Sequence, residues 1–230
     1  MTSEALIVKP LELGPMGNII YLLGCPETRE GAVIDPAWDP DAIRTAFAGL
    51  DLRLGHILVT HAHPDHINGL EELLDTTEAP AHINSDEIAY MKTMAGFFRI
   101  PIDFMARHEA KIHAVKDEDV IRVGRIEVRC IHTPGHSPGS QCFLAGGHLF
   151  SGDTLFVNAC GRVDLPGGDA SSMWRSLNRK LRDLPDELII RPGHDYAGRP
   201  SSTLGEEKRH NPYMQIGSEE QFLRLMGEAY

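Results

Sequence analysis

The segment VTHAHPDHINGL (Val59–Leu70) carries three histidines and one aspartate within six positions. It overlaps the short apolar run HILVT at 56–60, which predicts a buried strand. Because sites in open α/β sheets gather at the carboxyl ends of strands, these side chains are expected to line a pocket. His61 and His63 alternate, so they share one side of an extended segment, and the proline that follows favours that conformation. Imidazole and carboxylate groups at this spacing indicate a metal site.

Asp65 and His66 complete this cluster at the point where the apolar spacing of INGLEELL predicts a helix. Three more candidate ligands follow other apolar runs: His136 in HTPGHSPGS, Asp153 in LFSGDTLF and His194 in LIIRPGHDY. Each lies where a strand is expected to end, so the four segments are expected to converge. Together they supply five histidines and two aspartates, which is enough for two metal ions.

The composition is that of an ordinary globular protein: 230 residues, 42% hydrophobic and 24% charged, with a formal net charge of −11. An acidic chain is poorly suited to binding nucleic acid, because phosphate binding requires a basic surface. The first residues, MTSEALIVKPLELGPMG, do not resemble a signal peptide, and no apolar run approaches the length of a membrane span. We therefore expect a cytoplasmic protein that binds neither nucleic acid nor membrane.

The cysteines are widely spaced and form no CxxC pair, which favours free, mostly buried thiols in a reducing cytoplasm; they are Cys25, Cys130, Cys142 and Cys160. Cys160 is the exception to watch, since it lies in a glycine-containing loop close to candidate ligands. We do not expect it to be a ligand.

The chain contains no repeat, low-complexity segment or linker, so we expect a single domain over 1–230. A hairpin is expected from 18–23 and 32–35, and further strands at 56–60, 80–83, 111–115, 119–123, 126–133, 140–146 and 148–154, with a strand running into a loop at 187–196. Helices are expected at 39–50, 67–77, 85–94, 169–181 and 218–230. This alternation predicts an α/β fold with two mixed sheets and helices outside both faces.

The motif HAHPDH matches the HxHxDH signature of the metallo-β-lactamase superfamily, and TPGHSPGS, SGDTLF and RPGHDY resemble its later motifs. The resemblance implies the αββα sandwich of that superfamily, with metals at one edge of the sheets. It implies that one metal is bound by His61, His63 and His136, a second by Asp65, His66 and His194, and that Asp153 bridges them. The remaining histidines match no ligand position, and His132 is the best candidate to support a ligand; they are His56, His82, His108, His113, His132, His148 and His210.

Two longer segments, GDTLFVNACGRVDLPGGD and PGHDYAGRPSSTLGEEKRHNP, resemble the glyoxalase II-like branch of that superfamily. This branch holds hydroxyacylglutathione hydrolases and persulfide dioxygenases. Only 36 residues follow His194, which is too few for the helical glutathione-binding domain of full-length glyoxalase II. We therefore expect no separate domain of that kind, and recognition of glutathione stays open.

The first hypothesis is hydrolysis of a thioester, or of a related ester or lactone, by a metal-bound hydroxide at two divalent ions (zinc, or iron or manganese). His61, His63 and Asp65 are then the catalytic residues, with Asp65 also orienting the nucleophile. Arg162 and Tyr196 are expected to contact the substrate, a small molecule.

The alternative is oxygen chemistry with one Fe(II) held by His61, His136 and Asp153, a two-His-one-carboxylate set. The resemblance implies that a persulfide dioxygenase acting on glutathione persulfide would use these positions. HTPGHSPGS and DLPGGD favour the hydrolase, whereas HDYAG favours the dioxygenase, and we prefer the hydrolase.

The segment AGFFRIPIDFMARHEA (Ala95–Ala110) is apolar without a clear period. It is interpreted as a lid over the site, a dimer interface or part of the core, with no preference among these. A homodimer is the default expectation for the oligomeric state.

Overall fold

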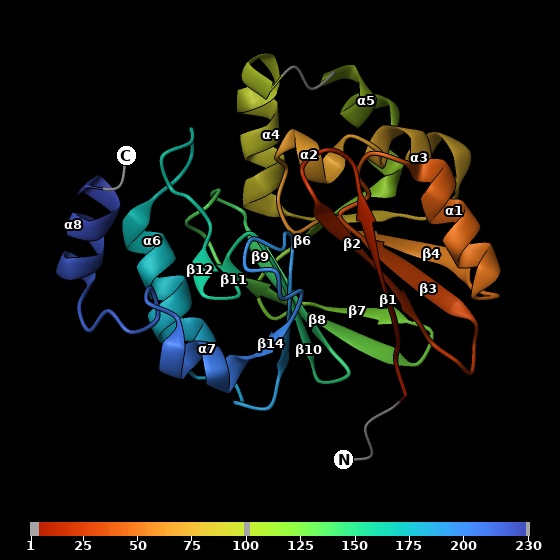
Figure 1. The fold of residues 1–230 in the computed structure, drawn as a ribbon. Coiled ribbons are helices and arrows are strands. Elements are labelled where there is room, and N and C mark those ends of the chain that lie inside the picture. The colour runs from red at the N-terminus through yellow and green to blue at the C-terminus, as the bar shows by residue number, and fades with distance from the viewer. Residues whose placement is uncertain (1–4, 99–101, 229–230) are drawn as a thin grey trace.

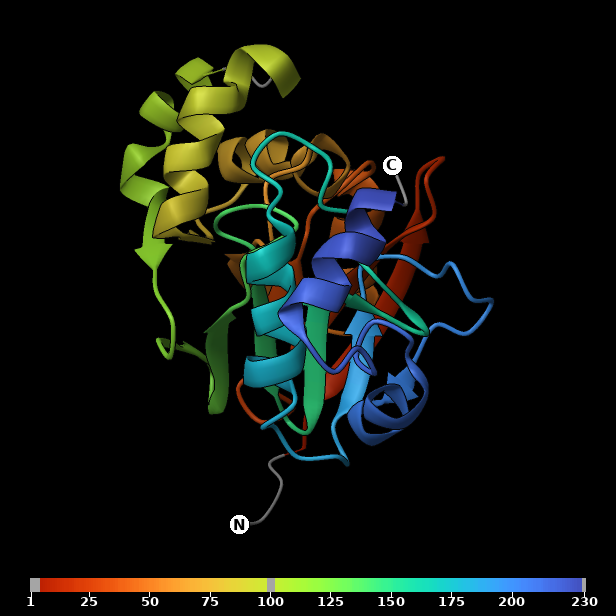
Figure 2. The same cartoon turned by 90° about the vertical axis from the view of Figure 1, so that its left-hand side faces the viewer.

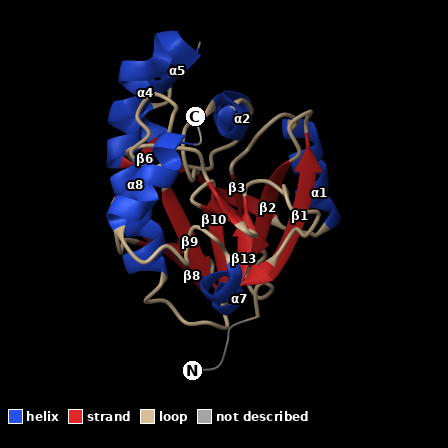
Figure 3. Cartoon of the chain, turned by 60° about the vertical axis from the view of Figure 1, so that its left-hand side comes forward, coloured by secondary structure: helices blue, strands red, loops and turns tan. Residues whose placement is uncertain are grey.

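The computed structural model describes residues 5–98 and 102–228. Within these residues the chain forms two six-stranded sheets and one short two-stranded sheet. The two large sheets face each other, and helices lie outside both of them (Figures 1 and 3). The αββα arrangement predicted from the sequence is therefore confirmed.

The first sheet holds the first six strands in chain order: β1 (Ile7–Leu13), β2 (Asn18–Gly24), β3 (Glu30–Ile34), β4 (Arg53–Leu58), β5 (Ala81–Asn84) and β6 (Ile112–Val115). β1, β2 and β3 are antiparallel to one another, which confirms the predicted hairpin of β2 and β3. From β3 to β6 the strands run parallel, so helices make the connections. These are α1 (Pro40–Gly49), α2 (Pro64–Ile67), α3 (Leu70–Thr76), α4 (Ser85–Phe98), α5 (Ile102–Arg107) and a 3₁₀ turn at Glu109–Lys111.

The second sheet has the order β14, β13, β10, β9, β8, β7. Its strands are β7 (Val120–Val123), β8 (Ile126–His132), β9 (Gln141–Ala145), β10 (His148–Gly152), β13 (Ile189–Pro192) and β14 (Ser202–Thr203). Only the β10–β13 pair is parallel among the described pairs of this sheet. The small sheet pairs β11 (Leu155–Phe156) with β12 (Ala159–Cys160). The outer helices are α6 (Ala170–Arg175), continued by a π-helical turn at Ser176–Leu181, α7 (Leu204–His210) and α8 (Glu219–Glu228), seen in front of the sheet in Figure 2.

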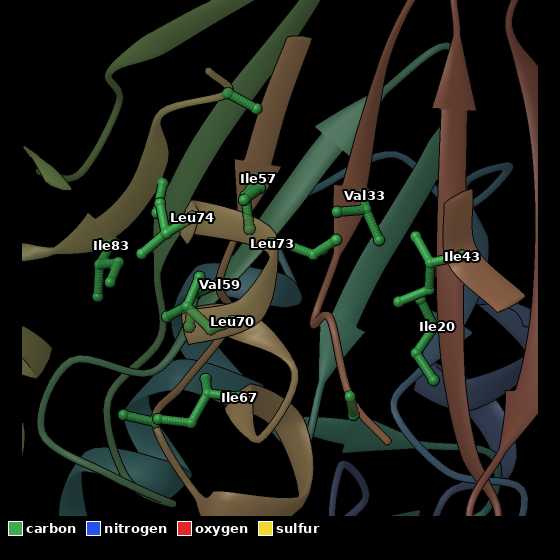
Figure 4. Close-up of a cluster of buried hydrophobic side chains, with 14 of the residues drawn as sticks. Ile20, Val33, Ile43, Ile57, Val59, Ile67, Leu70, Leu73, Leu74 and Ile83 are labelled. Carbon is green, nitrogen blue, oxygen red and sulfur yellow. The ribbon is translucent and has the colours of Figure 1, made fainter. Parts of the chain in front are cut away.

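Three apolar layers hold this sandwich together. The outer layer of the first sheet includes Leu70, Leu73 and Leu74 of α3, which pack beside Ile57 of β4 (Figure 4). Each of these leucines is fully buried, which is worth roughly 2 kcal/mol per side chain. A second cluster fills the space between the sheets, and a third lies between the second sheet and the helices α6 to α8.

Local signals explain where helices begin. The Asp39 side chain accepts a hydrogen bond from the Ala42 N–H at 2.9 Å, and a proline follows it at the first helical position of α1. Asp39 is therefore the N-cap of α1. Asp169 caps α6 in the same way through the Ser172 N–H.

Some predicted boundaries were wrong. The strand predicted at 56–60 ends at Leu58, because the Thr60 N–H donates to Asp35 Oδ1 instead of continuing the ladder. The helix predicted at 67–77 is split into α2 and α3 at Gly69, whose N–H donates to the Pro36 carbonyl. β1 was not predicted, since Pro10 interrupts its pattern; the strand tolerates a proline because it lies at the sheet edge.

The segment at 95–110 contributes to the core through Phe104 and Met105, which are buried in the outer layer of the first sheet. The Phe97 side chain is 64% exposed, and Ile100 lies outside the described residues. The core interpretation is thus confirmed for part of the segment, and the lid and interface interpretations stay predictions. No helix in the described part of the chain is long and apolar enough to span a bilayer.

Candidate metal centre

The structure brings all seven predicted ligands together at one edge of the sandwich. His61 and His63 follow β4, and Asp65 and His66 lie on the short helix α2. The other three follow strands of the second sheet: His136 after β8, Asp153 after β10 and His194 after β13. The expected convergence of strand ends is therefore observed, and it joins both sheets rather than one.

The first set consists of His61, His63 and His136, each with a ligand atom within 4.8 Å of those of the other two. Their ring centroids lie 4.5 to 4.8 Å apart, and all three side chains are buried. Burial lowers the pKa of all three imidazoles, and neighbouring histidines reinforce the effect at His61 and at His63, whose pKa falls to about 3. These rings are therefore neutral, which is the form that binds a metal.

The second set consists of Asp65, His66 and His194. Asp65 Oδ2 lies 3.4 Å from His66 Nε2 and 3.3 Å from His194 Nε2, and the two nitrogens are 3.2 Å apart. Burial would raise the pKa of the Asp65 carboxyl, but the hydrogen bond with His194 and the charge of His66 hold it well below its usual range. Asp65 is thus a carboxylate at neutral pH.

Asp153 lies between the two sets. Its carboxylate oxygens are 3.6 Å from His136 Nε2 of the first set, and 3.4 Å and 3.7 Å from the Nε2 atoms of His66 and His194 in the second. This is the position that a bridging ligand would need.

The chemistry of these residues fits divalent metal ions. His61 Nε2, His136 Nε2 and Asp153 Oδ1 are buried without a hydrogen-bond partner, and such orphaned atoms are costly unless something binds them. Burial opposes a charge on His66, yet Asp153 and Asp35 raise its pKa to about 10. The pocket therefore favours positive charge, and its nitrogen and oxygen donors suit zinc, iron or manganese.

Asp35 orients both sets and was not predicted from the sequence. It sits at the end of β3 with φ of +53°. Asp35 Oδ2 lies 3.0 Å from His66 Nδ1, so Nε2 of that ring faces Asp65 and Asp153. The same carboxylate accepts the Thr60 hydroxyl at 2.6 Å, and that hydroxyl lies 3.1 Å from His61 Nδ1. Such contacts fix the tautomer and direction of ligand histidines.

Asn18, at the start of β2, was missed as well. Its side-chain amide donates to Asp65 Oδ2 at 3.0 Å, and its oxygen accepts the Trp38 indole N–H at 2.8 Å. On the same side, His194 Nδ1 lies 3.2 Å from the carbonyl oxygen of Met16. The turn between β1 and β2 therefore supports the second set. A single asparagine without a motif gives no signal in the sequence.

The loop at 158–164 supports His136 through its backbone. His136 Nδ1 donates to the Arg162 carbonyl oxygen at 2.7 Å. Gly161 passes so close that an added Cβ would lie 1.9 Å from the Asp153 carbonyl oxygen. Cys160 is half-buried and free, the other three cysteines are buried and free, and no cysteine belongs to the ligand groups found among the described residues.

The two predicted substrate contacts lie near this centre. The Tyr196 ring stacks on His194 with centroids 5.2 Å apart, and its side chain is largely exposed. The Arg162 guanidinium pairs with Asp164 at 2.5 Å and is half exposed. His132, predicted to support a ligand, has its Nε2 2.9 Å from the Pro138 carbonyl oxygen in the loop that carries His136.

Comparison with known proteins places this centre in a family context. A sequence profile described as the metallo-beta-lactamase superfamily matches residues 14–194. A probable polyketide biosynthesis zinc-dependent hydrolase, BaeB of Bacillus velezensis, is 30% identical over 90% of this chain and 86% of its own length. Human mitochondrial persulfide dioxygenase ETHE1 is 34% identical over 90% of this chain and 75% of its own. A probable hydroxyacylglutathione hydrolase of Schizosaccharomyces pombe, glo2, is 30% identical over 90% of this chain and 86% of its own length.

Solved structures show the same relationship. The crystal structure of ETHE1 from Myxococcus xanthus has a TM-score of 0.82 and 33% identity, covering 97% of this chain and 91% of that one. A di-iron-bound form of the protein TTHA1623 has a TM-score of 0.73 and 32% identity, covering 90% and 100%. Relatives of this fold thus include zinc-dependent and di-iron proteins, hydrolases and a dioxygenase.

Proposed function

Because the chain belongs to the metallo-β-lactamase superfamily, we propose that it is a metal-dependent hydrolase with two divalent ions, acting on a thioester or a related ester or lactone. The observation that carries this proposal is the position of Asp153 between two complete three-residue ligand sets. A centre for one ion held by His61, His136 and Asp153 would leave the second set unused.

The proposed division of the ligands is the one that the family resemblance implies. His61, His63 and His136 would hold one ion and Asp65, His66 and His194 the other, with Asp153 shared between them. Two ions bound there would lower the pKa of a bound water towards about 7 and would polarise the substrate carbonyl.

Asp65 has a second task in this proposal. Its carboxylate is ionised and is fixed by the Asn18 amide at 3.0 Å, so it can accept a hydrogen bond from the attacking water and orient it. The water oxygen adds to the carbonyl carbon, the carbon–sulfur bond breaks, and a water proton ends on the thiolate. A thiol has a pKa of about 8.5, so the chain need not supply a strong general acid.

Tyr196 and Arg162 are proposed to contact the substrate. Although much of the side chain is exposed, partial desolvation by its neighbours, followed by the charges of Asp153 and Asp65, raises the pKa of Tyr196 to about 12. The hydroxyl therefore stays protonated at neutral pH and can donate a hydrogen bond. Asp153 and Asp65 act on the pKa of Tyr196 because the tyrosine lies close to these candidate metal ligands. A position beside the metal ligands supports its proposed role in contacting the substrate.

The second candidate is a persulfide dioxygenase with one Fe(II) on His61, His136 and Asp153. Similarity to ETHE1 proteins in sequence and structure favours it. It leaves Asp65, His66 and His194 without a direct role, although their atoms are as closely grouped as those of the first set. For this reason we rank it below the hydrolase.

The test compares two thioesters with one persulfide. Under anaerobic conditions, S-lactoylglutathione and S-acetyl-N-acetylcysteamine are offered separately, and thiol release is measured; an oxygen electrode then records consumption with glutathione persulfide. The proposal predicts anaerobic thiol release that His61→Ala abolishes and that the exposed His210→Ala leaves unchanged. Oxygen uptake with persulfide and no thioester cleavage would establish the second candidate instead.

A further inference from the structure

One buried carboxylate at the metal edge has no part in the ligand sets or in the proposed reaction. Glu87 lies in the first turn of α4 and is completely buried. It belongs to none of the sequence motifs discussed above.

Glu87 accepts three hydrogen bonds. Oε1 accepts the Ala62 N–H at 2.7 Å, while Oε2 accepts the Ser137 hydroxyl and the Gly139 N–H, each at 2.8 Å. Ala62 lies between His61 and His63, and Ser137 directly follows His136. One carboxylate therefore contacts both loops that carry the three-histidine set.

These two loops come from different sheets. The first ligand loop (residues 59–63) follows β4 of the first sheet, and the second ligand loop (residues 133–140) follows β8 of the second. The second loop packs tightly on the start of α4, since a Cβ added at Gly139 would lie 2.1 Å from the Glu87 backbone nitrogen. Glu87 thus ties the two sheets together at the position where their histidines meet.

A carboxylate in this place is poorly explained by stability alone. Its three partners are neutral donors, and no cation among the described residues lies within ion-pair distance of it. Burying a charge without an ion pair costs free energy, which an apolar side chain of similar size would avoid. The carboxylate instead holds three hydrogen-bond donors, which belong to two loops, at fixed positions relative to one another.

From this geometry we infer that Glu87 is a positioning residue that sets the His61–His63–His136 metal position by joining its two loops. The inference rests on the proposed function for the identity of that position. The other buried carboxylate, Asp35, contacts His66 of the second set and, through the Thr60 hydroxyl, His61 of the first. Substitution of Glu87 is therefore expected to affect the first metal position alone, whereas substitution of Asp35 is expected to affect both.

Glu87→Gln is the main variant, because it keeps the size of the side chain but replaces one acceptor oxygen with an NH₂ donor that faces other donors. The matched control is Glu78→Gln, at a highly exposed glutamate. Metal-depleted proteins are titrated with Co²⁺ and with Zn²⁺ by calorimetry and by Co²⁺ absorption, and circular dichroism verifies folding. Removal of a group supporting a ligand typically weakens metal binding about 10- to 100-fold.

We expect two binding steps in the native chain and in Glu78→Gln. In Glu87→Gln the metal affinity of one step falls about 10- to 100-fold, and the Co²⁺ absorption spectrum of that step changes. The affinity of the other step stays within about twofold of its native value. The weakened step is the one that His63→Ala abolishes, whereas Asp35→Asn is expected to weaken both steps, because Asp35 contacts His66 and, through the Thr60 hydroxyl, His61. If Glu87→Gln fails to fold, Ser137→Ala, which removes one donor, must weaken the same step.

Native metal affinity at both steps in a folded Glu87→Gln variant, or in Ser137→Ala, would overturn the inference. A native chain that binds one ion would instead contradict the proposed dinuclear centre. The inference would still be tested, because His61 and His136 also belong to the one-iron set. Glu87→Gln must then weaken the binding of that single ion.

Discussion

The imidazole rings of His61 and His136 lie with centroids 4.7 Å apart, although the two residues follow strands of different sheets. The candidate centre is therefore assembled only when the two sheets dock. A metal held between them links both halves of the sandwich, so binding and folding are coupled. Substitutions that disturb the docking of the two loops affect the metal as directly as substitutions of the ligands.

Substitution of the first two histidines distinguishes the two chemistries. His61→Ala removes a ligand used by either, so metal and activity are both lost. His63→Ala is nearly as harmful for a dinuclear hydrolase, but milder if one iron is held by His61, His136 and Asp153. Metal content and turnover of both variants are compared with His210→Ala. Full turnover with retained metal in His61→Ala would refute the site assignment.

Asp35→Asn tests the orientation of His66. The amide is less effective than a carboxylate in holding His66 Nδ1–H and the Thr60 hydroxyl together, so the ring is less well fixed. Loss of such support typically costs 10- to 100-fold in metal affinity or activity, and we expect about this loss in kcat/KM. Steady-state kinetics with saturating metal provide the measurement. Equal kcat/KM in variant and native protein would show that Asp35 is dispensable.

Gly161→Ala tests the close approach of the loop that supports His136. The added Cβ would meet the Asp153 carbonyl oxygen at 1.9 Å and His136 Nδ1 at 3.1 Å, so the loop must move away from two ligands. We expect at least about tenfold weaker metal binding. Gly49→Ala, at the end of α1 with no atom within 4 Å of the new Cβ, is the control and should be neutral or slightly stabilising. Native-like metal affinity in Gly161→Ala would contradict the geometry.

His82 makes the fold sensitive to acid. Burial, with help from His56 and His113, lowers its pKa to about 3, whereas an unfolded chain titrates near 6.5. Because the pKa of His82 is lower in the folded protein, protonation favours the unfolded chain. The contribution of neutral His82 to the free energy of unfolding is therefore fully present above pH 6.5 and is lost as the pH falls towards 3. At about 1.4 kcal/mol per pKa unit, the full loss is on the order of 5 kcal/mol.

His82→Gln should therefore reduce the fall in unfolding free energy between pH 6.5 and 4, as measured by urea denaturation of the metal-free protein. His210→Gln, at an exposed histidine, should leave the pH dependence as in the native chain. Parallel curves for native protein and His82→Gln would show that His82 does not take part.

Motif-bearing residues were the predictable part of the site, because several ligand-type side chains at strand ends stand out from a background of apolar runs. The sequence placed five of the candidate ligands just after predicted strands and the other two, Asp65 and His66, at the start of a predicted helix, and the structure brings all seven together. Asp35, Asn18 and Glu87 were not predictable, since each is a single polar residue whose meaning depends on contacts with distant loops. Their burial, rather than their spacing, identifies them.

For the fold, too, the overall architecture was predictable from the sequence pattern and some details were not. Strand and helix alternation predicted two sheets with outer helices, whereas β1 was hidden by Pro10 and the end of β4 by the Thr60–Asp35 hydrogen bond. These boundaries depend on tertiary contacts that local patterns do not contain.

The most direct test of the central claim is the metal content of freshly purified protein, measured by elemental mass spectrometry after expression with zinc, iron and manganese all available. The proposed dinuclear hydrolase predicts close to two metal ions per chain. Close to one iron per chain with little zinc would contradict it and would favour the persulfide dioxygenase.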